Sequence, residues 1–281
     1  MDRDDNFLPE RPAIFMGAPQ LWRWLSSLLA FLAILAMWSL TATALSRGLV
    51  PGPLVVIRSL CESWQTDPMI TTVSGQASGL WFHTYETMFR FFRYLSSGLI
   101  VSCLFLLVAC FEKRTIPILR QLTWIANPIP PLLLLPIVHA AGCPAAILEW
   151  TGGIFYPALA FLSIGLGSFD NNISSLELLM QQAGARRIWL TAHVRWPAVE
   201  FALLPSLKTH GAFTLGLTVV VEWMLAPTGL GRVMKYALSF NSGALLLSAV
   251  VLTVMIATIY EGLIDILVTM RLRWKVNSAA I

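Results

Sequence analysis

From Asp170 to Phe201 the chain reads DNNISSLELLMQQAGARRIWLTAHVRWPAVEF, a polar interval long enough to fold outside a membrane. Hydrophobic runs precede and follow it, and no other stretch in the second half of the chain is comparable. Its three arginines, Arg186, Arg187 and Arg195, lie close to the ends of those runs, where basic residues mark the cytoplasmic side. The interval therefore predicts a cytoplasmic loop between two membrane spans.

Two short helices are expected within this loop. Ser174 followed three residues later by Glu177 is the pattern of a capping box, and apolar residues then recur at helical spacing. A first helix should therefore begin here and end at Gly184. A second should cover residues 185–194, and Trp196 should close it, because a residue that precedes proline disfavours the α conformation.

The composition of the whole chain is that of an integral membrane protein. Of the 281 residues, 57% are hydrophobic and only 12% are charged, with a mean hydropathy of +0.71. Ordinary globular domains are about 25% charged. The net charge of +4 would suggest a nucleic-acid partner in a soluble protein, but the basic residues here cluster at the ends of apolar runs. They indicate orientation in a membrane, and no nucleic-acid partner is expected.

About six membrane spans are expected, so the predicted fold is an all-α polytopic bundle. Residues 1–20 lack the pattern of a cleavable signal peptide and are expected to form a cytoplasmic tail. The segment 46–84, with a short amphipathic piece near its start, should lie on the outer face. The third span contains five prolines and should not be a regular helix throughout. The expected spans are 21–45, 94–111, 116–140, 145–166, 204–226 and 244–270.

The distribution of basic residues sets the expected orientation. Of the 19 lysines and arginines, thirteen fall on the side of residues 170–201 and six on the other side. Both termini are therefore expected in the cytoplasm. Arg90 and Arg93, counted on the outer side just before the second span, are a local exception.

Several short motifs occur in a characteristic order along the chain. They are the run from Asn127 to Pro131, Ala183-Gly184-Ala185, Trp196-Pro197, Val221-Glu222 and Gly229-Leu230-Gly231. By these motifs the chain resembles the permease subunits of bacterial ATP-binding-cassette importers that depend on a binding protein. The similarity extends over roughly residues 51–274, and one departure is that Leu178, Leu179 and Met180 replace the Glu-Ala-Ala triplet of the family's loop.

The resemblance implies partners and a location. Permeases of this family work in the bacterial inner membrane with a separate cytoplasmic ATP-binding subunit and a periplasmic solute-binding protein. The family's importers contain two ATPases, and one coupling loop per chain accounts for only one of them. A second permease subunit, as in a homodimer, is therefore implied. The Asn-Pro-Ile-Pro-Pro run is similar to the branch that imports nitrate, taurine and alkyl sulfonates.

In this family the cytoplasmic loop, here residues 168–201, couples the permease to the ATPase. Ile188 and Trp189 would be exposed apolar groups in need of a partner surface. They could instead rest on the membrane interface, as amphipathic helices do. The residues expected in the coupling site are Ala183, Gly184, Ala185, Arg186, Arg187, Ile188, Trp189 and Pro197.

Motifs for enzymatic chemistry are missing from the sequence. There is no nucleotide-binding P-loop and no nucleophile elbow, and the four histidines are scattered. The four cysteines lack metal-type spacing and read as small hydrophobic residues. The chain is therefore not expected to be an enzyme, to bind a metal or to hold a cofactor.

Ionisable residues inside expected spans are candidates for a translocation path or gate. Glu149 and Glu222 are the two strongest, and the resemblance places Glu222 near an outer gate. Together with Glu261 and Asp265 of the sixth span, they could instead pair with basic groups such as Arg120 or Lys208 and hold helices together. The other candidates for this path are Pro128, Pro130 and Pro131.

The sequence thus predicts the transmembrane permease component of an ATP-driven importer of a small solute, such as a sulfonate, nitrate or taurine. One alternative is a secondary transporter or channel that works without an ATPase, which would leave residues 183–197 without a task. A second alternative is a membrane scaffold that does not transport.

Overall fold

The computed structural model describes residues 20–44, 50–74, 78–130, 137, 140–169 and 173–271. Every element within these residues is helical, which confirms the predicted all-α fold. The chain divides into two compact units, residues 1–55 and 56–281. Most of the predicted cytoplasmic tail and the C-terminal basic residues beyond Arg271 lie outside the described part.

The first unit contains one long helix, α1 (Gln20–Ala44), and the start of α2 (Pro53–Glu62). The first expected span, 21–45, matches α1 closely. Inside this unit the indole nitrogen of Trp38 donates a hydrogen bond of 3.1 Å to the carbonyl oxygen of Pro51. This bond ties Pro51 to the last third of α1.

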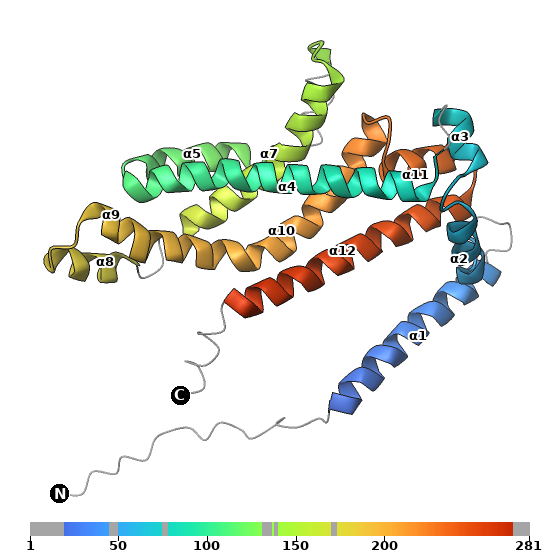
Figure 1. The fold of residues 1–281 in the computed structure, drawn as a ribbon, viewed down its shortest axis with the longest axis horizontal. Coiled ribbons are helices and arrows are strands. Elements are labelled where there is room, and N and C mark those ends of the chain that lie inside the picture. Colours follow the sequence, from blue (N-terminus) through green and yellow to red (C-terminus); the bar gives the residue numbers. More distant parts are fainter. Residues whose placement is uncertain are drawn as a thin grey trace, which may run out of the picture. The chain divides into compact units, whose positions relative to one another are not determined.

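The second unit is built around three long helices. These are α4 (Leu80–Phe111), α10 (Trp196–Met224) and α12 (Gly243–Arg271), drawn in Figure 1. The α7 helix (Ala145–Gly167) packs against both α4 and α10. The shorter helices of this unit are α3 (Pro68–Ser74), α5 (Thr115–Ala126), α8 (Ile173–Gln182), α9 (Arg187–Leu190), the π-helix η1 (Thr191–Arg195) and α11 (Leu230–Ser239).

Close packing of α4 against α7 depends on small residues. A Cβ atom at Gly98 of α4 would overlap Pro157 of α7. Ser102, one turn further along α4, donates a hydrogen bond of 2.7 Å to the carbonyl oxygen of Ala158. Small and hydroxyl-bearing side chains let helix backbones approach each other in this way in membrane bundles.

Three helices among the described residues are long and apolar enough to cross a membrane: α4, the Glu149–Gly167 part of α7, and α12. They correspond to the second, fourth and sixth expected spans. In α1 a shorter apolar segment, Leu28–Ala44, is also present. The total of six spans stays a prediction.

The second expected span, 94–111, lies within a longer helix. The α4 helix begins at Leu80 and runs through Arg90 and Arg93 without a break. Both arginines pair with carboxylates inside the protein, which offsets the cost of placing their charges within the bundle. They therefore belong to a helix and not to a connecting segment.

The third expected span, 116–140, is interrupted as its prolines predicted. The α5 helix ends at Ala126, just before the first proline of the Asn127–Pro131 run. A proline inside a helix removes a hydrogen bond and clashes with the preceding turn. Residues 131–136, which include Pro131, lie outside the described part.

The prediction that Trp196 closes a second loop helix is wrong. Trp196 has α dihedrals, φ −64° and ψ −45°, and begins α10. The chain instead widens into the π-helix η1, whose last bond runs from the Trp196 N–H to the carbonyl of Thr191. Pro197 has no N–H to donate, so the hydrogen-bond ladder that runs from η1 into α10 lacks one bond at this position.

Candidate functional site

A cluster of buried charges joins α4, α7 and α10 near the turn between α10 and α11. We call it the Arg90 cluster. Arg90 contacts three carboxylates, with distances of 3.2 Å to Glu222, 2.9 Å to Glu149 and 3.3 Å to Glu86. The Arg90 side chain is 9% exposed, and that of Glu222 is fully buried. The members of the Arg90 cluster are Glu86, Arg90, Arg93, Glu149 and Glu222.

Glu222 is held by hydrogen bonds as well as by charge. One carboxylate oxygen accepts a hydrogen bond of 2.8 Å from the Thr87 hydroxyl and one of 3.1 Å from the backbone N–H of Gly231. Gly229 has φ +111°, and a Cβ atom there would overlap the Glu222 carboxylate. The glycines of this turn therefore let the backbone close over the buried carboxylate.

Arg90 and two neighbours on α4 also fasten the same turn. The Arg90 guanidinium donates hydrogen bonds of 2.8 Å and 2.7 Å to the carbonyl and hydroxyl oxygens of Thr228. The Gly229 N–H donates to His83 over 3.0 Å, and the Leu230 N–H donates to the Thr87 hydroxyl over 2.8 Å. The whole turn between α10 and α11 is thus hydrogen-bonded to one face of α4.

Glu149 is shared by two arginines and a tyrosine. Its carboxylate oxygen accepts hydrogen bonds from Arg90, from Arg93 over 3.0 Å and from the Tyr94 hydroxyl over 2.8 Å. Burying a charge is costly unless it is paired and hydrogen-bonded, and each carboxylate here meets that condition. The arrangement can hold α7 and α10 against α4.

The sequence singled out Glu149 and Glu222, and the structure brings both together through Arg90. Their partner is neither Arg120 nor Lys208. Lys208 pairs with Asp265 at 2.7 Å, as predicted for the carboxylates of the sixth span. Arg120 donates to the carbonyl oxygen of Leu166. The residue that the sequence analysis missed is Arg90. The feature that could have pointed to it is Glu86, a carboxylate one helical turn before it.

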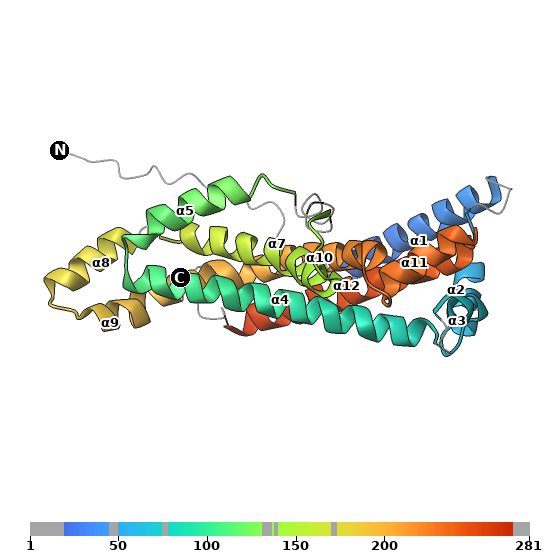
Figure 2. The same cartoon turned by 90° about the horizontal axis from the view of Figure 1, so that it is seen from above.

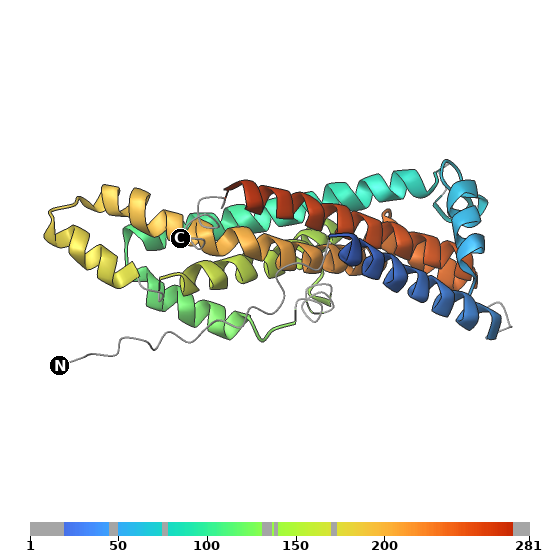
Figure 3. The same cartoon turned by 90° about the horizontal axis from the view of Figure 1, so that it is seen from below.

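At the other end of α10, α8 and α9 extend beyond the long helices, as Figures 2 and 3 show. We call residues 173–190 the α8–α9 loop. The predicted break at Gly184 is confirmed: it has φ +81°. The Gly184 N–H bonds to the carbonyl of Gln181, and the Ala185 N–H bonds to that of Met180. These two bonds form a Schellman motif, for which glycine is the usual residue.

Glu177 does not act as the partner in a capping box. It lies in the middle of α8 with its side chain 3% exposed, bonded to Arg195 of η1 and, over 2.7 Å, to Lys113. Burial raises the Glu177 pKa, but the hydrogen bonds from Arg195 and Lys113 outweigh this effect and hold the pKa below its usual value. The carboxylate therefore anchors α8 to the body of the protein.

Two further contacts fix the base of the loop. Arg195 and the Thr191 hydroxyl both donate to the carbonyl oxygen of Cys110, at the end of α4. Arg187 pairs with Glu112 over 3.0 Å, and the Arg187 hydrogen bond is the main cause that lowers the Glu112 pKa. The loop is thus tied to the end of α4 by polar contacts at several points.

Two apolar side chains of the α8–α9 loop are exposed beside its polar residues. The Ile188 side chain is 73% exposed and that of Trp189 is 41% exposed, although Trp189 stacks on His193 with ring centroids 4.6 Å apart. A hollow of about 340 Å³ opens beside them. Met180, Ala183, Gly184, Ala185, Arg186 and Trp189 line it. Of the predicted coupling residues, five therefore border one depression, Ile188 and Arg187 lie beside it, and Pro197 lies apart, in the first turn of α10.

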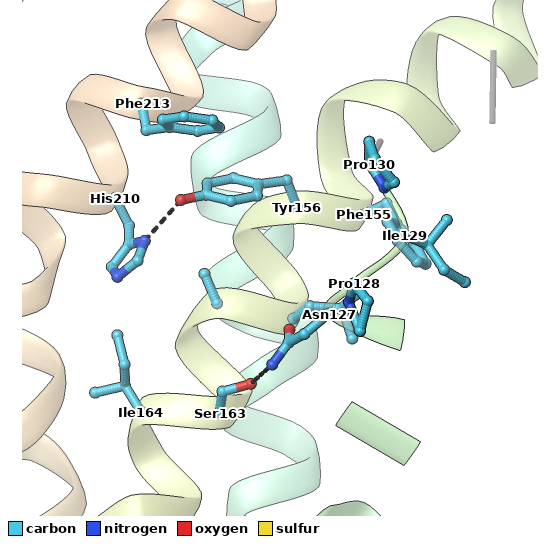
Figure 4. Close-up of a pocket in the computed structure, with 12 residues that line it drawn as sticks. Asn127, Pro128, Ile129, Pro130, Phe155, Tyr156, Ser163, Ile164, His210 and Phe213 are labelled. Carbon is cyan, nitrogen blue, oxygen red and sulfur yellow. Dashed lines mark hydrogen bonds between the residues drawn. The ribbon is translucent and has the colours of Figure 1, made fainter. Parts of the chain in front are cut away.

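A second cavity, of about 430 Å³, lies between the end of α5, α7 and α10. Pro128 and Pro130 line it, whereas Glu149 and Glu222 do not. The Arg90 cluster and this cavity are therefore separate features. Figure 4 shows the lining side chains.

Within the described residues, no group of three or more His, Cys, Asp or Glu side chains is placed to hold a metal ion. All four cysteines, Cys61, Cys103, Cys110 and Cys143, are free, and Cys110 is buried as a small hydrophobic residue would be.

Comparison with known proteins adds no assignment, because no family model matches the chain and no curated protein is significantly similar to it. A functional proposal therefore rests on three features of the structure: the Arg90 cluster, the α8–α9 loop and the cavity.

Proposed function

We propose that this chain is the transmembrane permease subunit of an ATP-driven importer, and that the α8–α9 loop is its contact with a cytoplasmic ATP-binding subunit. The observation that carries the proposal is the loop itself. It is fixed by the Glu177, Arg195 and Lys113 bonds, and it exposes Ile188 and Trp189 of α9, which we call the tip. An anchored loop with exposed apolar side chains is suited to dock on a partner and to pass movement to it.

The rest of the machine follows from the same proposal. A second copy of this chain would complete a pair of permeases in a bacterial inner membrane, with both termini in the cytoplasm and a periplasmic binding protein delivering the solute. The solute would be a small anion such as a sulfonate, nitrate or taurine. The motif at Asn127–Pro131 supports this choice, and the apolar helices α4, α7 and α12 support a membrane location.

The proposal is tested by placing a charged residue at the tip of the loop and measuring whether the ATPase still binds. Affinity-tagged full-length protein would be purified from its native membranes, and the ATP hydrolysis that co-purifies with it would be measured. Ile188→Asp should lower that activity by about tenfold or more, as loss of a central apolar contact does at protein interfaces. The amount of the chain in the membrane should not change, because Ile188 packs against little of the protein.

Leu54→Asp is the matched control, since Leu54 is also an exposed apolar residue, at 81%, on a short helix. It should leave the co-purified ATP hydrolysis unchanged. Equal activity in parent and Ile188→Asp preparations would rule out this docking surface. Solute uptake with no ATPase partner at all would instead favour a secondary transporter or channel.

A further inference from the structure

The cavity between the end of α5, α7 and α10 has the size of a small-molecule site. Its volume of about 430 Å³ lies within the range of roughly 300–1,000 Å³ that is usual for ligand pockets. We call it the ring pocket. Its lining residues are Asn127, Pro128, Ile129, Pro130, Phe155, Tyr156, Leu159, Ala160, Ser163, Ile164, His210 and Phe213.

Aromatic rings dominate one side of the ring pocket. The rings of Tyr156 and Phe213 lie with their centroids 4.4 Å apart at an angle of 37°, and the His210 ring lies 6.0 Å from that of Tyr156. In Figure 4 these three side chains face one another across the space between α7 and α10. Such surfaces favour a flat apolar body, because rings stack on it in offset or tilted geometry.

Polar groups in the ring pocket are few and lie in two pairs. The Tyr156 hydroxyl and His210 Nδ1 are 2.9 Å apart. On the other side the Asn127 amide donates a hydrogen bond of 3.0 Å to the Ser163 hydroxyl. An amide group has two N–H donors and a hydroxyl can donate as well as accept, so this second pair keeps capacity for a ligand.

The described residues that line the ring pocket include no Asp, Glu, Lys or Arg. A compact ion such as nitrate would therefore lose its hydration without meeting an oppositely charged side chain, which is unfavourable. A solute with a larger apolar body recovers free energy by burying that body, about 25 cal/mol for each Å² removed from water.

We propose that the ring pocket binds a small solute that has an aromatic or otherwise flat apolar body and one hydrogen-bonding head group. The body would lie against Tyr156 and Phe213, and the head group would take hydrogen bonds from Asn127 and Ser163. As a stage of translocation this assignment rests on the proposed permease function. It narrows the transported anions to organic ones with an apolar body, such as aromatic sulfonates, and disfavours nitrate.

The test uses the full-length chain in lipid nanodiscs without any partner, and three probes. Benzenesulfonate and methanesulfonate share a head group and differ in the ring, whereas nitrate has neither ring nor alkyl body. Equilibrium binding of each is measured by isothermal titration. Benzenesulfonate should bind at least about tenfold more tightly than either of the others. Equal binding of all three, or no binding of benzenesulfonate, would overturn the proposal.

Two phenylalanines provide a matched pair of variants. Phe213 lines the ring pocket and is 55% exposed, whereas Phe105 on α4 is 47% exposed and does not line it. Phe213→Leu should weaken benzenesulfonate binding about threefold to tenfold, the usual worth of an aromatic pair. Phe105→Leu should leave it unchanged. The same affinity in both variants would place the bound probe elsewhere and refute the site.

A Ser163→Ala variant tests the other end of the pocket. It should weaken benzenesulfonate binding about fivefold, as loss of one hydrogen bond does, and should not alter the preference over methanesulfonate. Because these measurements need no ATPase, they separate the two proposals. Ring-selective binding without any ATPase partner would leave the pocket standing and remove the importer. An ATPase partner without ring-selective binding would support the importer and refute the ring pocket as a solute site.

Discussion

The Arg90 cluster and the tip of the α8–α9 loop reverse the ordinary distribution of residues in opposite ways. In the cluster, charged groups are buried among long apolar helices, with the Glu222 side chain fully enclosed. At the tip, Ile188 and Trp189 face outward from a polar loop. Both arrangements are unfavourable unless a partner covers the misplaced group.

The difference between the two regions lies in where the partner is. The charges of the cluster have theirs within the chain, because each carboxylate meets an arginine and at least one further donor. Among the described residues nothing covers Ile188. The buried polar network can therefore be explained by contacts within the chain alone. The exposed apolar tip on a well-anchored loop instead points to a second protein.

The largest effect is expected from removal of the central cation of the cluster. Arg90→Gln would leave Glu149 and Glu222 buried without their shared partner, and breaking a buried ion pair in this way costs about 3–5 kcal/mol. The variant should accumulate poorly and unfold at a clearly lower temperature in detergent. Arg58→Gln is the control, because the Arg58–Glu62 pair is 80% and 63% exposed, and such pairs contribute little.

Thermal unfolding of the two purified variants gives the decisive comparison. If Arg90→Gln were as stable as Arg58→Gln, the cluster would not hold α4, α7 and α10 together. Arg90→Lys should fall between them, because an ammonium group cannot reproduce the forked bonds of the guanidinium to Glu149, Glu222 and Thr228.

The anchor of the loop should give the next largest effect. Glu177→Gln removes the charge that Arg195 and Lys113 share, and a hydrogen bond to a charged group is worth about 1.5–3 kcal/mol. The backbone amides of α8 should therefore exchange with deuterium faster at pH 7, while those of α4 should not change.

The same bond predicts a dependence on pH. Because the Glu177 pKa is depressed in the folded protein, its stabilisation is fully present above the ordinary glutamate value of 4.5 and is lost as the pH falls through the lower folded value. Acidification below pH 4.5 should loosen α8 in the parent protein, after correction for the intrinsic exchange rate. A Glu177→Gln variant that showed the same acidic step would assign the transition to another group.

These two regions also show how far the sequence can lead. The end of α8 at Gly184 and the bounds of α12 were predictable, because a glycine at a helix end and a long apolar run act through neighbours along the chain. The role of Arg90 was not, because Glu149 and Glu222 lie 59 and 132 residues away from it. The π-helix before Trp196 was not predictable either, because it too depends on contacts between distant parts of the chain. A residue before proline tends to avoid the α conformation, but this is only a preference, and the contacts of Thr191 and Arg195 with Cys110 override it.

A change at the turn of the loop should have a local effect of about 1–3 kcal/mol, the usual cost of a residue held in an unfavourable backbone conformation. Gly184 has φ +81° and open space around it, so Gly184→Val would be strained by its backbone alone. Gly216 also has open space but lies within α10, which makes Gly216→Val the control. Gly184→Val should still accumulate in the membrane, yet lose co-purified ATP hydrolysis and solute uptake.

Gly184→Ala should be milder than the valine variant, because a β-branched residue is the poorest choice at positive φ. Membrane abundance, ATP hydrolysis and uptake would be measured side by side for the four proteins. Normal uptake in Gly184→Val would mean that the α8–α9 loop is an ordinary connector.

The smallest effect is expected for the pair formed by Lys208 on α10 and Asp265 on α12. Their side chains are 41% and 57% exposed, and the atoms are 2.7 Å apart. An exposed pair in water contributes about 0.2–1 kcal/mol and is screened by salt, whereas a pair in hydrocarbon keeps its strength. A double-mutant cycle with Lys208→Gln and Asp265→Asn should therefore give a coupling below about 1 kcal/mol that falls further in 1 M salt. Such a result would mean that water reaches this end of α10 and α12. A coupling of about 2 kcal/mol or more that salt leaves unchanged would instead place the pair within the bilayer, where it would resemble the Arg90 cluster and not a surface contact.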